Sequence, residues 1–203
     1  MYYKDLRANL IFLLERFGVC DYNALLNFFR SHKREHIDYQ INSLVHDSYA
    51  KIIPVFDPAT NEKQSYANGE PKLIIQWTKC SDIQPEYIED NTAALRIMAS
   101  EAFGENAIAD FTRLASPMTA AWLTHDNMVY DLIVFNESNI DGRSLYFPYA
   151  RAQFQTAGVP DDVVHLAAVS DPELLSRLQP YSFDCFYYLP PEGEPILYQY
   201  TED

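Results

Sequence analysis

Apolar residues recur at helical spacing three times within the first 45 residues. The first series ends at Phe17 just before Gly18, and it predicts a helix over residues 4–17. Asp21 and Ser31 are residue types that cap helices, so a further helix is predicted after each of them. The apolar positions of the three helices are Leu6, Leu10, Leu13, Leu14 and Phe17, then Leu25, Leu26, Phe28 and Phe29, then Ile37, Ile41, Leu44 and Val45.

Two stretches rich in β-forming residues follow, at residues 49–56 and 72–77. The polar segment between them contains Asn68-Gly69, which is a strong turn signal, so the two stretches predict a hairpin. Three short helices followed by a hairpin resemble a winged helix-turn-helix domain, and the resemblance covers residues 5–79. A helical bundle with an appended hairpin stays open as the alternative.

In the second part of the chain, helix signals and strand signals alternate. Pro85 suits the first turn of a helix, and Ser170-Asp171-Pro172-Glu173 is a capping box that predicts a helix to residue 178. Strands are predicted at 120–124, 128–135, 163–169 and 183–189, with weak helical character at 144–157. This order predicts a small α/β domain with a mixed sheet, and an α+β fold for the whole chain.

Charge divides the chain at the same place as the predicted elements. Residues 1–79 hold ten Lys and Arg against nine Asp and Glu, whereas residues 80–203 hold five Arg, no Lys and twenty Asp and Glu. The net charges are therefore +1 and −15, which indicates two units with different partners. We expect a winged-helix domain at 1–79, a linker and helix start at 80–90, an acidic α/β domain at 91–190 and an acidic tail at 191–203.

The third predicted helix carries the residues most suited to duplex DNA. If its apolar stripe faces the core, Tyr39, Asn42 and Ser43 face outward, where Asn42 suits an adenine edge and Tyr39 a phosphate. Basic residues lie before this helix and on the hairpin. The predicted DNA-binding residues are Arg30, His32, Lys33, Arg34, Tyr39, Asn42, Ser43, Lys51 and Lys63. Glu35, Asp38 and Asp47 on the same helix favour the alternative, a surface for protein contact.

A second set of candidates consists of His125, Asp126, Asp131 and Glu137, which are weak candidates for a metal site. Residues 90–169 resemble a restriction-endonuclease-like core, in which an acid opens one strand and an acidic-x-Lys motif lies on the next. The combination with a winged helix resembles mobile-element proteins of the plasmid replication-relaxation type. The resemblance matches Asp126 and Asp131 to the two acids, but Ile133 occupies the lysine position, and no Lys follows Lys79.

That lysine helps to activate the attacking water beside the metal, so its loss argues against nuclease activity. The three cysteines have no metal-binding or disulfide spacing, no phosphate-binding or hydrolase motif is present, and no cofactor is expected. No stretch is apolar enough for a signal peptide or a membrane span, so a cytoplasmic location is expected.

These patterns predict a non-enzymatic DNA-binding regulatory or mobile-element accessory protein, whose acidic domain binds a protein partner or a second copy. A protein-interaction module that does not bind DNA is one alternative. A divergent divalent-metal nuclease is the other.

Overall fold

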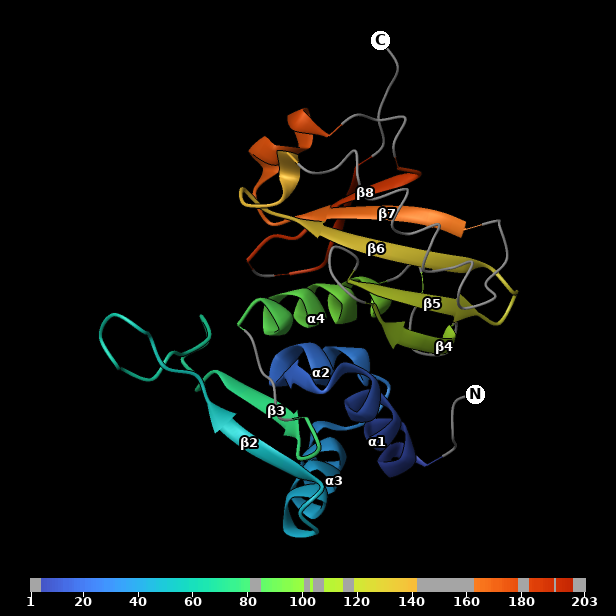
Figure 1. Cartoon of the computed structure of the whole chain (residues 1–203). Helices are drawn as coiled ribbons and strands as arrows, with labels where there is room; N and C mark the ends of the chain where they lie inside the picture. Colours follow the sequence, from blue (N-terminus) through green and yellow to red (C-terminus); the bar gives the residue numbers. More distant parts are fainter. Residues whose placement is uncertain are drawn as a thin grey trace. The chain divides into compact units, whose positions relative to one another are not determined.

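The computed structural model describes residues 5–80, 85–100, 103, 108–114, 119–141, 163–178, 183–191 and 193–198. The described residues form a mixed α+β protein with five helices, a three-stranded antiparallel sheet and a six-stranded mixed sheet (Figure 1). The chain divides into two compact units, Met1–Leu95 and Arg96–Asp203. The first unit thus extends beyond residue 79, because it includes most of the helix that begins at Pro85.

The first unit contains α1 (Leu6–Phe17), β1 (Val19–Asp21), α2 (Tyr22–Phe28), α3 (Arg34–His46), β2 (Ala50–Pro54) and β3 (Leu73–Trp77). Gly18 ends α1 in a left-handed conformation, with φ of 75°, and its N–H donates to the Leu14 carbonyl. Asp21 caps α2 by accepting a hydrogen bond from the Ala24 N–H at 3.0 Å. The predicted cap at Ser31 is wrong, because α3 begins after Lys33, which forms no side-chain cap bond.

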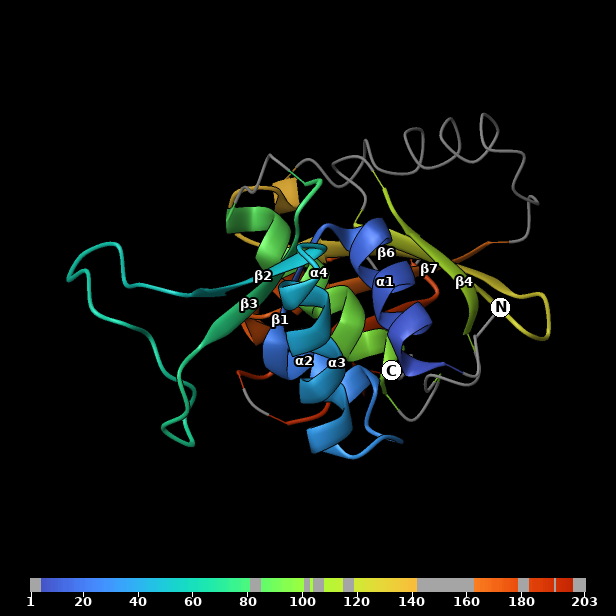
Figure 2. The same ribbon diagram turned by 90° about the horizontal axis from the view of Figure 1, so that it is seen from below.

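The sheet of the first unit has the strand order β1-β3-β2, and both pairings are antiparallel. Its central strand is β3, in which Ile75 pairs with Cys20 on one side and with Ile52 on the other. Six of the apolar residues of the three predicted helices, two from each, are buried: Leu10, Leu14, Leu25, Phe28, Ile41 and Leu44. Between β2 and β3 the chain makes a long excursion over residues 55–72, which runs beyond both strands (Figures 1 and 2).

Helix α4 (Pro85–Met98) begins at the predicted proline. Asn91 on this helix is completely buried, and its Nδ2 donates to the Phe17 carbonyl at 3.0 Å and to the Val19 carbonyl at 2.7 Å. These carbonyls lie at the end of α1 and at the start of β1. Asn91 of α4 therefore satisfies two backbone carbonyls at the point where α1 ends and β1 begins.

The second unit contains β4 (Ile108–Arg113), β5 (Ala120–Thr124), β6 (Val129–Phe135), β7 (Val163–Val169), η2 (Pro172–Arg177), β8 (Cys185–Tyr188) and β9 (Ile196–Tyr198). These strands lie in chain order across the sheet. The pairs β4–β5, β5–β6 and β8–β9 are antiparallel, while β6–β7 and β7–β8 are parallel. The strand predicted at 163–169 is confirmed, and the helix expected at 144–157 lies outside the described residues.

One face of this sheet carries an apolar cluster. Ile133 and Phe135 of β6, Ala167 and Val169 of β7 and Phe186 of β8 are buried together with Leu174 and Leu175 of η2. Strands β4 and β9 were not predicted, since no clear alternating pattern marks β4 and a proline-rich sequence precedes β9. Figure 1 shows β6, β7 and β8 side by side, with η2 at the end where β7 finishes.

Candidate functional site

Helix α3 buries one face and exposes the other. Ile37, Ile41 and Leu44 are buried, whereas the Tyr39 side chain is 69% exposed and Asn42 is also exposed. The helical repeat places Glu35, Tyr39, Asn42 and His46 on the side opposite the buried residues. A polar, outward-facing surface is therefore available on α3, at the positions that the sequence pattern predicted.

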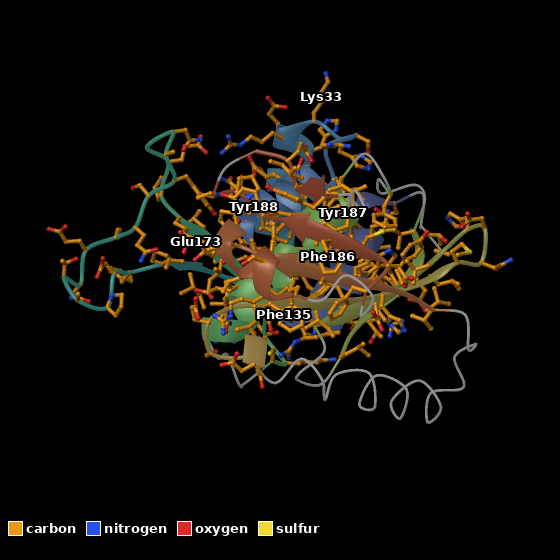
Figure 3. All side chains as sticks on the ribbon, turned by 90° about the horizontal axis from the view of Figure 1, so that it is seen from above. Lys33, Phe135, Glu173, Phe186, Tyr187 and Tyr188 are labelled. Atoms are coloured by element: carbon orange, nitrogen blue, oxygen red, sulfur yellow. The ribbon has the colours of Figure 1, made fainter. Side chains whose placement is uncertain are left out.

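The basic residues before α3 and on the hairpin differ in how far they are exposed to solvent. Arg30 and Lys33 are exposed, and the Lys33 side chain points away from the ribbon (Figure 3). His32 is half-buried. Lys51 of β2 and Lys63 of the 55–72 excursion are exposed. These exposed cations are in positions where they can meet an anionic ligand.

Ser43 is not outward-facing as predicted, because α1 covers it. It is half-buried, and its hydroxyl accepts a hydrogen bond from Arg7 Nη1 at 2.7 Å. Arg7 also binds Asp47, with an Nη2 to Oδ2 distance of 2.7 Å. The pKa of Asp47 is lowered by its hydrogen bonds with His46 and Arg7. This group joins α1 to the end of α3, so Ser43 serves the fold.

Arg34 is also engaged within the first unit. Its Nη1 and Nη2 donate to the two carboxylate oxygens of Glu70 at 3.1 and 3.0 Å, which is a bidentate pair. Its Nε lies 3.8 Å from Asp38 Oδ2, and its guanidinium lies 5.8 Å from the centre of the Tyr22 ring. The Tyr22 hydroxyl in turn donates to Asp38. The hydrogen bonds from Arg34 hold the pKa of Glu70 below its usual value.

The four weak metal candidates are not brought together as one site. His125 and Asp126 are exposed in the turn between β5 and β6, and Asp126 accepts a hydrogen bond from Thr124. Glu137 lies beyond the other end of β6 and pairs with Arg177 at 2.8 Å. Asp131 and Phe135 are separated by four strand steps, about 13 Å, and Glu137 lies beyond Phe135, so Asp131 and Glu137 are not placed to share an ion. In the described ranges, no three His, Cys, Asp or Glu side chains are placed to hold a metal ion.

Asp131 instead forms a buried pair with His165, which the sequence did not link to the hairpin. Parallel pairing of β6 with β7 sets the two residues opposite each other, and Nδ1 of His165 lies 2.8 Å from Oδ2 of Asp131. The Asp131 side chain is 0% exposed and that of His165 is 29% exposed. Asp131 Oδ1 is buried without a hydrogen-bond partner.

The two pKa values reflect these surroundings. Burial raises the pKa of Asp131, and the hydrogen bond to Asp131 raises the pKa of His165. Asp184 lies just before β8, and its carboxylate accepts the His165 backbone N–H at 2.7 Å. Both strands were predicted, at 128–135 and 163–169, so aligning them as a parallel pair with matched ends was the one signal that could have found this contact.

No helix of the described part of the chain is long and apolar enough to cross a membrane. Comparison of the chain with protein-family models, with curated proteins and with solved structures gives no significant match, so its function is argued from its own residues.

Proposed function

We propose that residues 5–79 form a winged helix-turn-helix that binds duplex DNA. The proposal extends to the whole chain, as a non-enzymatic regulatory or mobile-element accessory protein whose acidic second unit binds a protein partner. The element order α1, β1, α2, α3, β2, β3 and the sheet order β1-β3-β2 support this interpretation. In such a domain α3 is the helix that enters the major groove, and the 55–72 excursion is the wing.

The observation that carries the proposal is the exposed polar face of α3. Asn42 offers an amide that can pair with an adenine edge, and Tyr39 offers a hydroxyl for a phosphate or a base. Lys33 and Arg30 are exposed at the start of this helix, where they suit the flanking phosphates. The exposure of these four residues supports base contacts by Tyr39 and Asn42 and phosphate contacts by Arg30 and Lys33.

The small number of cations predicts weak, salt-sensitive binding. Four exposed cations suit phosphates, namely Arg30, Lys33, Lys51 and Lys63. If each neutralises one phosphate, the slope of log K against log salt is about −3.6. Titration of the full chain with duplex DNA over a range of salt concentrations measures this slope.

Matched variants locate the binding surface. We expect Lys33→Gln to weaken binding and to make the slope less steep by about 1. Lys79→Gln is the control, because Lys79 is an exposed cation that lies after β3 and away from the wing and the start of α3. Equal effects of the two substitutions, or no binding at low salt, would overturn the proposal.

The absence of enzymatic activity is part of the proposal. The separation of Asp131 from Glu137 and the burial of Asp131 support it. Incubation with single- and double-stranded DNA and Mg²⁺ or Mn²⁺ tests it. Cleavage that disappears in Asp126→Ala or Asp131→Ala would establish the nuclease alternative instead.

A second candidate function, protein binding by the second unit, is favoured by the edge strand β9. Its residues Ile196, Leu197 and Tyr198 are 49%, 43% and 44% exposed, and among the described strands β9 pairs with β8 alone. An edge strand with exposed apolar side chains can accept another strand. Light scattering of the full chain tests self-association, and Leu197→Glu should abolish any dimer that forms through this edge.

A further inference from the structure

The contact between Arg34 and Glu70 joins the start of α3 to the wing. Both side chains are partly exposed, at 50% for Arg34 and 40% for Glu70. Glu70 accepts hydrogen bonds from Nη1 and Nη2 of Arg34, and Asp38 lies beside Nε. The central carbon of the guanidinium lies over the Tyr22 ring. The pair of end-on donors, one on Nη1 and one on Nη2, with which Arg34 could bind a phosphate is therefore taken by Glu70.

The turn that carries Glu70 is held in place without this contact. The Glu70 N–H donates to Asn68 Oδ1 at 3.0 Å, and the Glu70 carbonyl accepts from the Tyr66 N–H at 2.8 Å. The Tyr66 hydroxyl donates to Asp21 Oδ2 at 2.9 Å, which ties the turn to the start of α2. The Glu70 carboxylate can therefore be changed without releasing the wing.

Arg34 can also exchange Glu70 for another anion at little cost in free energy. Partly exposed ion pairs are weakly stabilising, because water solvates both partners once they separate. A DNA phosphate offers Arg34 the same bidentate geometry as a carboxylate. The Tyr22 ring and Asp38 do not involve the wing, so they keep the guanidinium near the start of α3 after Glu70 has left.

We propose that Glu70 is a brake on DNA binding, which holds Arg34 away from the phosphate backbone and adds a negative charge beside the DNA-binding helix. This inference rests on the proposed function, since it identifies how the same surface is restrained. Arg34 then binds a phosphodiester only after it has left Glu70. The ligand class is the phosphate backbone of duplex DNA, without regard to base sequence.

The test compares Glu70→Gln with Glu62→Gln in the full chain. Each substitution removes one wing carboxylate, but Glu62 is exposed in the 55–72 excursion and has no ion pair with a described residue. We expect Glu70→Gln to bind duplex DNA about tenfold more tightly at low salt and to steepen the salt slope by about 0.9, the value of one added phosphate contact. Glu62→Gln should change affinity by less than about twofold.

The third variant, Glu70→Gln with Arg34→Gln, should lose the gain. A purely structural role for the pair predicts the opposite sign, with equal or weaker binding after Glu70→Gln. If the wild type binds DNA but Glu70→Gln binds no more tightly than Glu62→Gln, the brake is overturned and the proposed function stands. If no variant binds DNA, both are overturned.

Discussion

One pair of oppositely charged side chains in the first unit and one in the second differ in how far they are exposed to solvent. In the first unit Arg34 and Glu70 meet at the surface with both side chains partly exposed, whereas in the second unit Asp131 meets His165 beneath the surface of the sheet. A surface pair contributes little to the stability of the fold, and exchanging one partner costs little free energy. When a buried pair loses one partner, the other is left as an uncompensated charge. Exchangeable charge therefore suits a binding surface, and the buried pair marks a position that the fold cannot easily change.

The largest effect is expected when the buried pair loses its histidine. His165→Ala leaves the Asp131 carboxyl buried without its donor, and it should lower the free energy of unfolding by about 3–5 kcal/mol. Denaturant unfolding at neutral pH measures the loss. The double variant Asp131→Val, His165→Val should recover most of it, because two apolar residues of strand-forming type remove the unpaired charge. A loss below about 1 kcal/mol for His165→Ala would contradict the comparison.

A core substitution in the first unit should come next. Leu44 is completely buried on α3, so Leu44→Ala should cost about 2–5 kcal/mol through lost burial and the cavity that remains. Tyr39→Ala on the exposed face of the same helix is the control, with an expected change within about 0.5 kcal/mol. Similar losses for the two variants would mean that the faces of α3 are assigned wrongly.

The free energy of unfolding should depend on pH through the buried pair of Asp131 and His165. The pKa of His165 is raised in the folded state, so its contribution is full below the unfolded value of about 6.5 and is lost as pH rises through the folded pKa. The raised pKa of Asp131 acts in the same direction, since the folded state favours its protonated form. Urea unfolding of the wild type should therefore show a declining advantage over Asp131→Val, His165→Val from pH 6 to pH 9. A rising advantage would refute this interpretation.

The smallest effect is expected for the surface pair. A double-mutant cycle with Arg34→Gln and Glu70→Gln should give a coupling energy of at most about 1 kcal/mol. Chemical unfolding at moderate salt provides the measurement. A coupling of 3 kcal/mol or more would be of the size expected for a buried pair, and it would make Glu70 a structural residue rather than an exchangeable one.

The local elements of the first unit were predictable because single residues fix their ends. Gly18 and Asp21 mark where α1 stops and α2 starts, and the apolar spacing of α3 identifies its buried face. Strand β1 was missed because three residues between two helix signals leave no alternating pattern to read. The cap at Ser31 was wrong because the helix starts three residues later, after a residue that cannot accept a capping bond.

The site residues were predictable only where exposure follows from periodicity. Tyr39 and Asn42 are exposed for that reason, but the partners of Arg34 and Ser43 lie 36 residues away along the chain. The Asp131–His165 contact spans 34 residues and depends on the register of two parallel strands. The first two contacts are set by how α3 packs against α1 and the 55–72 excursion, and the third by how two strands align. A pattern along one element does not contain that information.

Asn91 has a practical consequence for anyone who wishes to prepare the first unit alone. A fragment that stops at residue 79 matches the winged-helix pattern, yet it lacks the amide that satisfies the Phe17 and Val19 carbonyls. It also removes the buried residues Ala93, Ala94 and Leu95, which belong to the same compact unit. Because α4 continues to Met98, a fragment made for binding measurements should keep that whole helix. A 1–79 fragment that fails to fold would not test DNA binding.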